Sequence, residues 1–440
     1  MADVRPFRGL RYGLDQVDLG NALAPPYDVI DAPAQQALHA RSPFNVIRLE
    51  YPFEEGEAST SQRRDALTLL EWLAHGVLRR DPVPAFYLHE QRFSLLGEER
   101  SRLGLIAAVR LHAPEERVIL PHEHTTPKPV EDRLSALRAI QTNVSPIFGL
   151  FRDRNGEAAT AARAATQAPP LVEAMCEGET HRLWAIADTA QQQALQRLFE
   201  GRVVYLADGH HRFQAARAYR DECAARQSPR EAEARAADLR DRAWQFVLMH
   251  LVALEDPGLV VLPLHRLLRG LNTEAQGALD EALGAFLVEP LPLPDDAEFA
   301  ARTIIAALAA KVAAGPAYCL LRLGSEALML APKAPREGGS AHLRPTLDVV
   351  LLHRLLIDRL VDSPQAATDR GDLAYTPWAV EALQQVRSGA YQVALFQNPV
   401  PVSRIAELAE QGQQMPPKST YFHPKLPTGL VLKRSDDGPL

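Results

Sequence analysis

Residues 203–216 bring together several residue types that can do chemistry. An apolar run over 203–207 predicts a strand, and an Asp-Gly turn with a helix behind it follows. The polar positions of this motif are Asp208, Gly209, His210, His211 and Arg212. A helix N-terminus offers backbone N–H groups and the positive end of the helix dipole, so anions bind there. Because Gly209 allows close approach and Arg212 can bind a phosphate bidentately, we interpret the motif as a phosphate-binding turn.

The same motif has a purely structural interpretation. Asp208 can cap the helix while the two histidines lie exposed on its first turn. In the functional interpretation, Asp208 accepts a proton or binds a metal, and the imidazoles donate to phosphate oxygens. The position of the motif between a strand and a helix favours the functional interpretation.

A second polar cluster, His122-Glu123-His124, stands between two prolines. It is not the zinc-protease motif HExxH, because the position that needs the second histidine is Thr126. In an extended segment His122 and His124 share one face and, with Glu123, can bind a divalent metal or transfer protons. The alternative is a polar surface loop.

Two further clusters follow prolines. Tyr27 and Asp28 come directly after two prolines that fix an extended backbone, although the motif alone favours a helix or turn entry capped by Asp31. Near the C-terminus, a proline-stiffened loop carries Lys418, Ser419, Thr420 and Lys425. Lysines and hydroxyls on a rigid backbone suit a phosphate or carboxylate clamp, and the alternative is a rigid surface loop. This loop lacks the glycines of a Walker A motif.

The elements that must position these clusters alternate between strands and helices. We expect strands over 45–51, 85–92, 101–111, 145–151, 203–207 and 244–254, and helices over 62–77, 130–140, 154–168, 190–200, 274–285, 297–313, 347–360 and 402–411. A charged connection over 227–242 divides the chain into an N-terminal α/β domain, 1–242, and a C-terminal α/β domain, 243–440. The expected fold class is mixed α/β.

Composition narrows the class of protein. The 440 residues carry a net charge of −7, which argues against general nucleic-acid binding. The three cysteines are far apart and match neither a disulfide framework nor a zinc site, so a reducing cytoplasm is the expected location. No signal peptide and no apolar run of about 18 residues is evident, and we expect no membrane association.

Seven stretches, taken together and in this order, resemble the prokaryotic family called domain of unknown function 1015. The stretches are 25–30, 45–49, 122–125, 145–150, 208–212, 256–266 and 415–422. The one departure is His124, where the family more often has Arg. More distantly, residues 208–216 are similar to the phosphate-binding box of the ParB/sulfiredoxin-like superfamily, which includes kinases of free serine. That resemblance implies a ParB/sulfiredoxin-like fold for the N-terminal domain and binding of nucleotide phosphates.

The leading hypothesis is a nucleotide-dependent phosphotransferase or phosphohydrolase that acts on a small hydroxylated metabolite, with serine or phosphoserine favoured. ATP or ADP and Mg²⁺ are the expected cofactors, the partner is a small phosphorylated substrate, and a homo-oligomer is compatible with the sequence. The expected catalytic residues are Glu123, Asp208, His210 and His122, with Glu123 as base and Asp208 as metal or phosphate organiser. The expected phosphate- and substrate-binding residues are Gly209, His211, Arg212, Lys418, Ser419, Thr420, Lys425, Asp28 and Tyr27, and the metal candidates are Asp208, Glu123 and His124.

Two alternatives come from other classes. One is a non-catalytic protein that senses a nucleotide or metabolite through the same turn. The other is a metal-dependent hydrolase built on His122, His124, His210 and His211, since four imidazoles can hold zinc or a similar ion.

Overall fold

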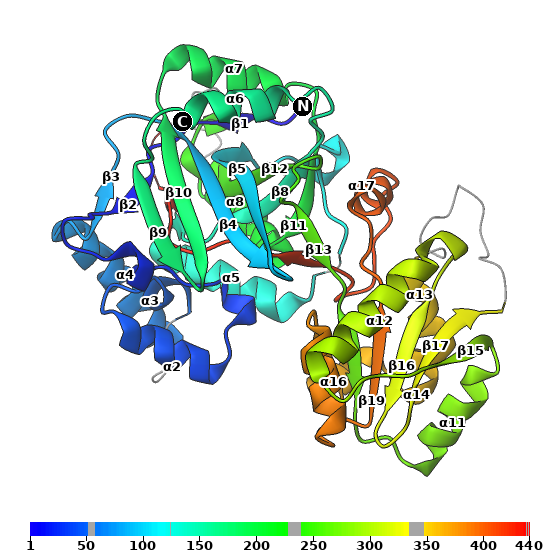
Figure 1. The fold of residues 1–440 in the computed structure, drawn as a ribbon. Coiled ribbons are helices and arrows are strands. Elements are labelled where there is room, and N and C mark those ends of the chain that lie inside the picture. Colours follow the sequence, from blue (N-terminus) through cyan, green and yellow to red (C-terminus); the bar gives the residue numbers. More distant parts are fainter. Residues whose placement is uncertain (52–57, 124, 228–238, 334–346, 437, 439) are drawn as a thin grey trace. The chain divides into compact units, whose positions relative to one another are not determined.

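The computed structural model describes residues 1–51, 58–123, 125–227, 239–333, 347–436, 438 and 440. The chain forms two compact units, Met1–Val260 with Pro424–Leu440, and Val261–His423. Both units contain sheets with helices, which confirms the expected mixed α/β class (Figure 1). The unit boundary differs from the expected division after residue 242. The reason is that β12 (Phe246–Ala253) hydrogen-bonds between two strands of the first unit, and the C-terminal segment returns to that unit.

The first unit is built on a mixed sheet of nine strands. Eight of them follow the order β6-β11-β8-β12-β5-β4-β10-β9, and β1 (Val4–Arg5) pairs with β5 (Figure 1). The remaining strand bounds are β4 Phe86–Leu95, β5 Glu98–Arg110, β6 Ile119–Leu120, β8 Ile147–Phe151, β9 Val172–Cys176, β10 Glu179–Ile186 and β11 Val204–Asp208. The strands expected over 85–92 and 101–111 are present as β4 and β5, which pair antiparallel on either side of the turn at Gly97.

Two helices follow neighbouring parallel strands and therefore begin at the same edge of the sheet. Strands β6 and β11 pair in parallel, and α5 (Pro127–Ile140) and α8 (His210–Ala225) come after them. Helix α5 buries Leu134, Leu137 and Ile140, whereas α8 buries Phe213, Ala216 and Tyr219, as the helical spacing predicts. This edge, where the parallel strands end, is where ligands commonly bind in α/β folds.

Apolar clusters cover both faces of the sheet. One cluster joins the sheet to the N-terminal segments and to residues 430–432, and the other joins it to α5, α6, α7 and α8. The other elements of this unit are β2 Leu10–Tyr12, α1 Leu19–Ala22, η1 Tyr27–Val29, α2 Ala32–Arg41, α3 Ile47–Glu50, α4 Ala58–Ala74, β3 Leu78–Arg80, η2 Pro114–Glu116, β7 Thr142–Asn143, α6 Glu157–Ala165, α7 Thr189–Phe199, η3 Ala243–Gln245 and β21 Lys433–Arg434.

The strand expected over 45–51 was wrong, because the segment turns into the short helix α3. The Asn45 side chain explains the difference. Its carbonyl accepts a hydrogen bond from the Ile47 backbone N–H at 3.0 Å, and its amide donates to the Leu23 carbonyl at 2.9 Å. An Asn side chain that bonds its own backbone two residues on starts a turn, which overrides the β propensity of the apolar residues.

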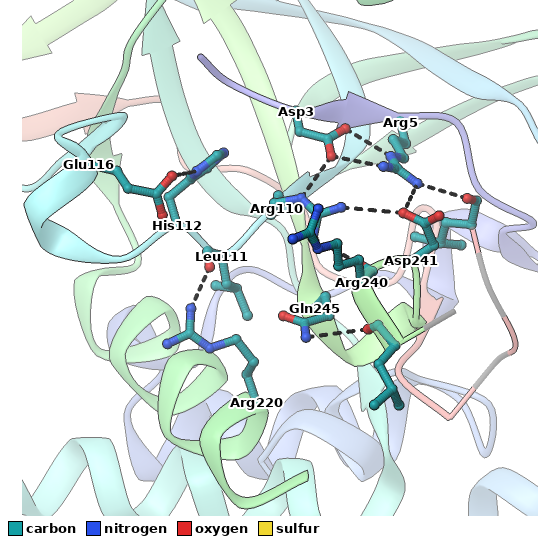
Figure 2. Close-up of polar contacts among 12 residues, drawn as sticks. Asp3, Arg5, Arg110, Leu111, His112, Glu116, Arg220, Arg240, Asp241 and Gln245 are labelled. Carbon is teal, nitrogen blue, oxygen red and sulfur yellow. Dashed lines mark hydrogen bonds and ion pairs between the residues drawn. The ribbon is translucent and has the colours of Figure 1, made fainter. Parts of the chain in front are cut away.

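Polar contacts hold α8 and the sheet together at the end remote from the start of the helix. Arg220 on α8 donates to the Leu111 carbonyl just past β5 (Figure 2). Beside it, Asp3 accepts from Arg5 at 2.8 Å and from Arg110 at 2.8 Å, which ties β1 to β5. These contacts fix where α8 lies relative to the strands that carry the site described below.

The second unit has its own six-stranded sheet, with the order β15-β17-β16-β19-β14-β18 (Figure 1). The strands of this unit are β13 Val260–Leu262, which begins at the boundary residue, β14 His265–Leu268, β15 Phe286–Leu291, β16 Tyr318–Arg322, β17 Ala327–Pro332, β18 Leu373–Thr376, β19 Val393–Gln397 and β20 Tyr421–His423. Its helices are α11 Thr273–Leu283, α12 Ala297–Lys311, η4 Val312–Ala314, α13 Asp348–Leu352, η6 His353–Ile357, α14 Asp358–Leu360, α15 Pro364–Asp369, α16 Ala379–Arg387 and α17 Val402–Glu410. Among the helices in the described parts of the chain, none is long and apolar enough to cross a lipid bilayer.

Candidate functional site

The turn between β11 and α8 has the backbone geometry that the sequence predicts. Gly209 is the N-cap of α8, with φ 87° and ψ 28°, a left-handed conformation that favours glycine. Its N–H donates to Asp208 Oδ1 at 2.8 Å. A Cβ placed on Gly209 would lie 3.1 Å from Arg212 Nη2, so the guanidinium folds back against the turn. The start of α8 is thus bracketed by a carboxylate and a guanidinium.

Lys425 reaches this turn from the C-terminal segment of the same unit. Its Nζ lies 2.7 Å from Asp208 Oδ2, and both side chains are mostly buried, at 14% and 22% exposure. Burial alone raises the pKa of Asp208, but the charges of Lys425 and Arg212 outweigh it and hold that pKa well below its ordinary value. Asp208 is therefore ionised, and Arg212 is a second cation near it in addition to Lys425.

Arg212 lies among several carboxylates. Its Nη1 donates to the Pro146 carbonyl at 2.7 Å, just before β8. Burial lowers the pKa of Arg212, but the negative charges of Asp208, Asp28 and Glu50 outweigh that effect and raise it. The guanidinium therefore stays charged, and its position is fixed by the Pro146 bond.

The two histidines His122 and His210 pack together behind the turn. Their rings are perpendicular, with centroids 4.7 Å apart. Burial lowers the pKa of His122 to about 4, which the Leu206 carbonyl and Asp208 offset only in part. Burial and the neighbouring His122 also lower the pKa of His210. Both rings are therefore neutral near pH 7 and act as hydrogen-bonding groups rather than as cations.

His210 has an atom available for a ligand, and His211 joins two helices. The His210 side chain is 7% exposed, and among the described residues its Nε2 has no hydrogen-bond partner. His211 Nε2 accepts a hydrogen bond from the Thr126 backbone N–H at 3.3 Å. Since Thr126 is the N-cap of α5, this bond joins the first turns of α5 and α8. The helix dipoles of both first turns then add to the positive potential there.

A layer of aromatic and charged groups surrounds Arg212. The Arg133 guanidinium stacks 4.1 Å over the ring of Tyr27, and it donates to the Glu50 carbonyl at 2.9 Å. Glu50 is buried and accepts from the Ser145 hydroxyl at 2.8 Å. Burial raises the pKa of Tyr27 to about 12, although Arg212 and Arg133 lower it. A cavity of about 50 Å³ is lined in part by Glu50, Arg133 and Arg212.

The structure brings together some of the predicted residues. Around the start of α8 lie His122, Asp208, Gly209, His210, His211, Arg212 and Lys425, with charge interactions linking Tyr27 and Asp28 to Arg212. Glu123 is half-buried and follows His122, whereas His124 lies outside the described residues. In the parts of the chain that the structure describes, no group of three or more His, Cys, Asp or Glu side chains is arranged to hold a metal ion.

The loop residues Lys418, Ser419 and Thr420 belong to the second unit. Lys418 has a positive φ of 59°, and its carbonyl accepts from Arg266 Nη2 at 3.2 Å. The Ser419 hydroxyl donates to the Pro416 carbonyl at 2.6 Å and is buried. This loop is therefore ordered by its own unit, and its contribution to phosphate binding stays a prediction.

Two site residues have no counterpart in the sequence analysis, Arg102 on β5 and Gln91 on β4. Arg102 Nη2 donates to the Pro424 carbonyl at 2.7 Å, and Gln91 Nε2 donates to the Lys425 carbonyl at 2.9 Å. Both side chains are fully buried. In the sequence Gln91 lies between Glu90 and Arg92, and Arg102 ends the polar run 98–102. Polar runs of this kind indicate solvent-exposed positions rather than buried ones.

The chain matches one family model and is similar to several solved structures. A family model described as "Protein of unknown function (DUF1015)" matches residues 4–349. The chain is similar to a solved structure titled "Free serine kinase in complex with AMP", at 14% identity, covering 72% of this chain and 86% of that chain, with a TM-score of 0.33. It is also similar to a conserved hypothetical protein from Pyrococcus furiosus, at 12% identity, 76% and 96% coverage and a TM-score of 0.34. A third is SbnI with a C-terminal truncation from Staphylococcus aureus, at 11% identity, 75% and 88% coverage and a TM-score of 0.34. No curated protein gives a significant match.

Proposed function

The chain belongs to the DUF1015 family, and we propose that this member is a nucleotide-dependent phosphotransferase or phosphohydrolase that acts on a small hydroxylated metabolite, with serine or phosphoserine favoured. The observation that carries the proposal is the start of α8, where Gly209, Arg212 and Lys425 surround the first turn of a helix. Such a site suits a phosphate group, because backbone N–H groups and two cations point to one place.

Phosphoryl transfer depends mainly on positioning and on neutralising the charge of the equatorial oxygens. Arg212 and Lys425 supply that charge here, and both are held by neighbours, at the Pro146 carbonyl and at Asp208. His210 offers its Nε2 as a neutral hydrogen-bonding group. Preorganised groups of this kind need little rearrangement when charge develops on the phosphate.

We assign proton transfer from the substrate hydroxyl to Glu123, which is half-buried next to His122. Asp208 is assigned as the organiser of Lys425 rather than as a metal ligand, because its charge is already matched by the lysine. Among the described residues, no group of three or more His, Cys, Asp or Glu side chains is arranged to hold a metal ion, and no residue is assigned here as a Mg²⁺ ligand.

Incubation with labelled ATP and a panel of small hydroxylated metabolites tests this proposal. We expect the label of ATP to appear on one metabolite, with serine first. In the reverse assay with labelled phosphoserine and ADP, we expect the label to appear in ATP or in inorganic phosphate. Heat-inactivated protein serves as the blank. Absence of any phosphorylated or dephosphorylated product across the panel, together with tight nucleotide binding, contradicts the enzymatic proposal.

The second candidate is a non-catalytic protein that binds a nucleotide or metabolite at the same turn. The ion pair of Asp208 with Lys425 favours it, because the lysine charge is already matched and is less available to neutralise a phosphoryl group in transfer. Calorimetric binding without turnover across the panel distinguishes the two candidates.

A further inference from the structure

Lys425 is delivered to Asp208 by a segment that strands β4 and β5 hold. The chain re-enters the first unit at Pro424, directly before Lys425. Arg102 donates to the Pro424 carbonyl at 2.7 Å, and Gln91 donates to the Lys425 carbonyl at 2.9 Å. Two consecutive carbonyls of the segment are thus held by two side chains of the sheet.

Arg102 and Gln91 also hold each other. They are directly opposed in the β4–β5 pairing, and Arg102 Nη2 donates to Gln91 Oε1 at 2.5 Å. The guanidinium lies 4.9 Å above the ring of Phe148, which is itself opposed to Asp208 in the β8–β11 pairing. Because opposed residues of a sheet point to the same face, Gln91 and Arg102 share one face, and the Arg102 guanidinium reaches Phe148.

Burying the charged Arg102 guanidinium costs free energy that its neighbours must offset. The Arg102 side chain is 0% exposed, and burial lowers its pKa to about 10, so it stays charged at neutral pH. Arg102 donates to the neutral oxygens of Gln91 and Pro424, and the negative charges of Glu179 and Asp256 offset part of the effect of burial. A buried cation needs such compensation from its neighbours, which holds its side chain in one place.

The segment that leads from the first unit to the second, which includes Asp256 and Gly258, is also held by β5 beside Arg102. Asp256 Oδ2 accepts from the Leu103 backbone N–H at 3.2 Å, beside Arg102. A Cβ placed on Gly258 would lie 2.1 Å from the Ser101 carbonyl oxygen, so this backbone packs directly on β5. Residues 101–103 therefore secure both points at which the chain crosses between the units.

We propose that Arg102 and Gln91 are positioning residues that hold the Pro424–Lys425 backbone so that the Lys425 ammonium stays at Asp208. The inference deepens the proposed function, because Lys425 is one of the two cations assigned to the phosphate. Neither Arg102 nor Gln91 is assigned a contact with the phosphate. They act through Lys425.

The test measures the reactivity of Lys425 toward an acetylating reagent, read by mass spectrometry in the full chain, together with the affinity for ATP. In the wild type the ion pair and burial protect Lys425. In Gln91→Leu and Arg102→Met we expect Lys425 to react about tenfold faster, since hydrogen bonds that hold it are lost. Arg102→Lys keeps one donor and should restore part of the protection.

Two lysines serve as internal standards. Lys433 is buried and donates to the Ala243 carbonyl at 2.7 Å, so it should stay slow in every variant that folds. Lys128 is exposed and should react at one rate throughout. The matched control is Arg100→Met on the same strand, whose side chain pairs with Glu98. Faster acetylation of Lys433 in a variant shows that the variant is generally unfolded. Lys425 is then compared between the wild type and whichever of Gln91→Leu and Arg102→Lys keeps Lys433 protected.

The outcomes separate this inference from the proposed function. Faster acetylation of Lys425 together with weaker ATP binding supports the positioning role and the proposed function. Faster acetylation of Lys425 with unchanged ATP binding supports the positioning role and contradicts the role of Lys425 at the phosphate. Wild-type Lys425 reactivity in a variant that keeps Lys433 protected overturns the inference.

Discussion

The Lys425 ammonium lies 2.7 Å from the Asp208 carboxylate, although 217 positions separate the two residues in the chain. Asp208 ends β11 directly before the start of α8, and Lys425 belongs to the segment that returns to the first unit. The pair closes the polar end of the sheet at the place where α5 and α8 begin. Arg212 and Lys425 both place positive charge near Asp208.

Breaking this ion pair on one side should destabilise the first unit. Lys425→Met leaves the Asp208 carboxylate buried beside Arg212 alone, and Asp208→Asn leaves a buried ammonium. We expect each single change to cost about 3 kcal/mol in unfolding free energy at pH 7, and the double variant to cost less than the sum. Urea unfolding of the four proteins measures the coupling. Additive costs would show that the two side chains do not interact in solution.

Arg212→Ala should weaken ATP binding by about 10- to 100-fold, the equivalent of one or two charge-assisted hydrogen bonds. The fold should persist, since the hydrogen bond lost with the Arg212 side chain is the one to the Pro146 carbonyl. Arg226→Ala is the control, because Arg226 ends the same helix and is 64% exposed. Calorimetric titration gives the affinities, and equal values for the two variants would exclude Arg212 from the phosphate site.

Gly209→Ala should damage the site more than the fold. A left-handed backbone strains any residue with a Cβ by about 1–2 kcal/mol, and here the Cβ also pushes against the Arg212 guanidinium. Gly156→Ala is a matched control, since Gly156 is the N-cap of α6 with φ 67° and has no atom within 4 Å of an added Cβ. Both variants should lose similar thermal stability, while only Gly209→Ala loses ATP affinity. A similar loss of ATP affinity in both variants would show that the contact between the added Cβ and Arg212 does not affect ATP binding.

Stability should fall as the pH is lowered from about 6.5 to about 4. Burial lowers the folded-state pKa of His122 to about 4 from its ordinary value of 6.5, so the unfolded chain binds more protons across that window. Burial does the same to His181, whose Nδ1 lies 3.1 Å from His89 Nε2 in a buried imidazole pair. Urea unfolding of the wild type at several pH values measures the slope.

The variant His122→Asn should reduce that slope, because an amide does not titrate. His75→Asn is the control, since His75 is exposed on the first unit. A slope that His122→Asn leaves unchanged would show that His122 is not buried in its neutral form.

The sequence by itself determined the local structure of the turn. An apolar strand, an Asp-Gly pair and a helical spacing of apolar residues specify strand, left-handed glycine and helix, because these are short-range preferences of the backbone. The strands on either side of Gly97 followed from similarly local signals, whereas His122 joins the turn through the long-range pairing of β6 with β11. The resemblance to one family also lay in the sequence, and the family model, which matches residues 4–349, confirms the family; the stretch 415–422 lies outside that match.

The tertiary structure decided which distant residues join the turn. Lys425 and Lys418 look alike in sequence, yet only Lys425 belongs to the unit that contains Asp208, because Arg102 and Gln91 hold its backbone. Short-range sequence patterns also could not predict that β12 lies within the first sheet. Strand order depends on hydrogen bonds between segments far apart in the chain. Residue types and spacing fix what a short segment can do, but long-range pairing and burial fix which segments meet.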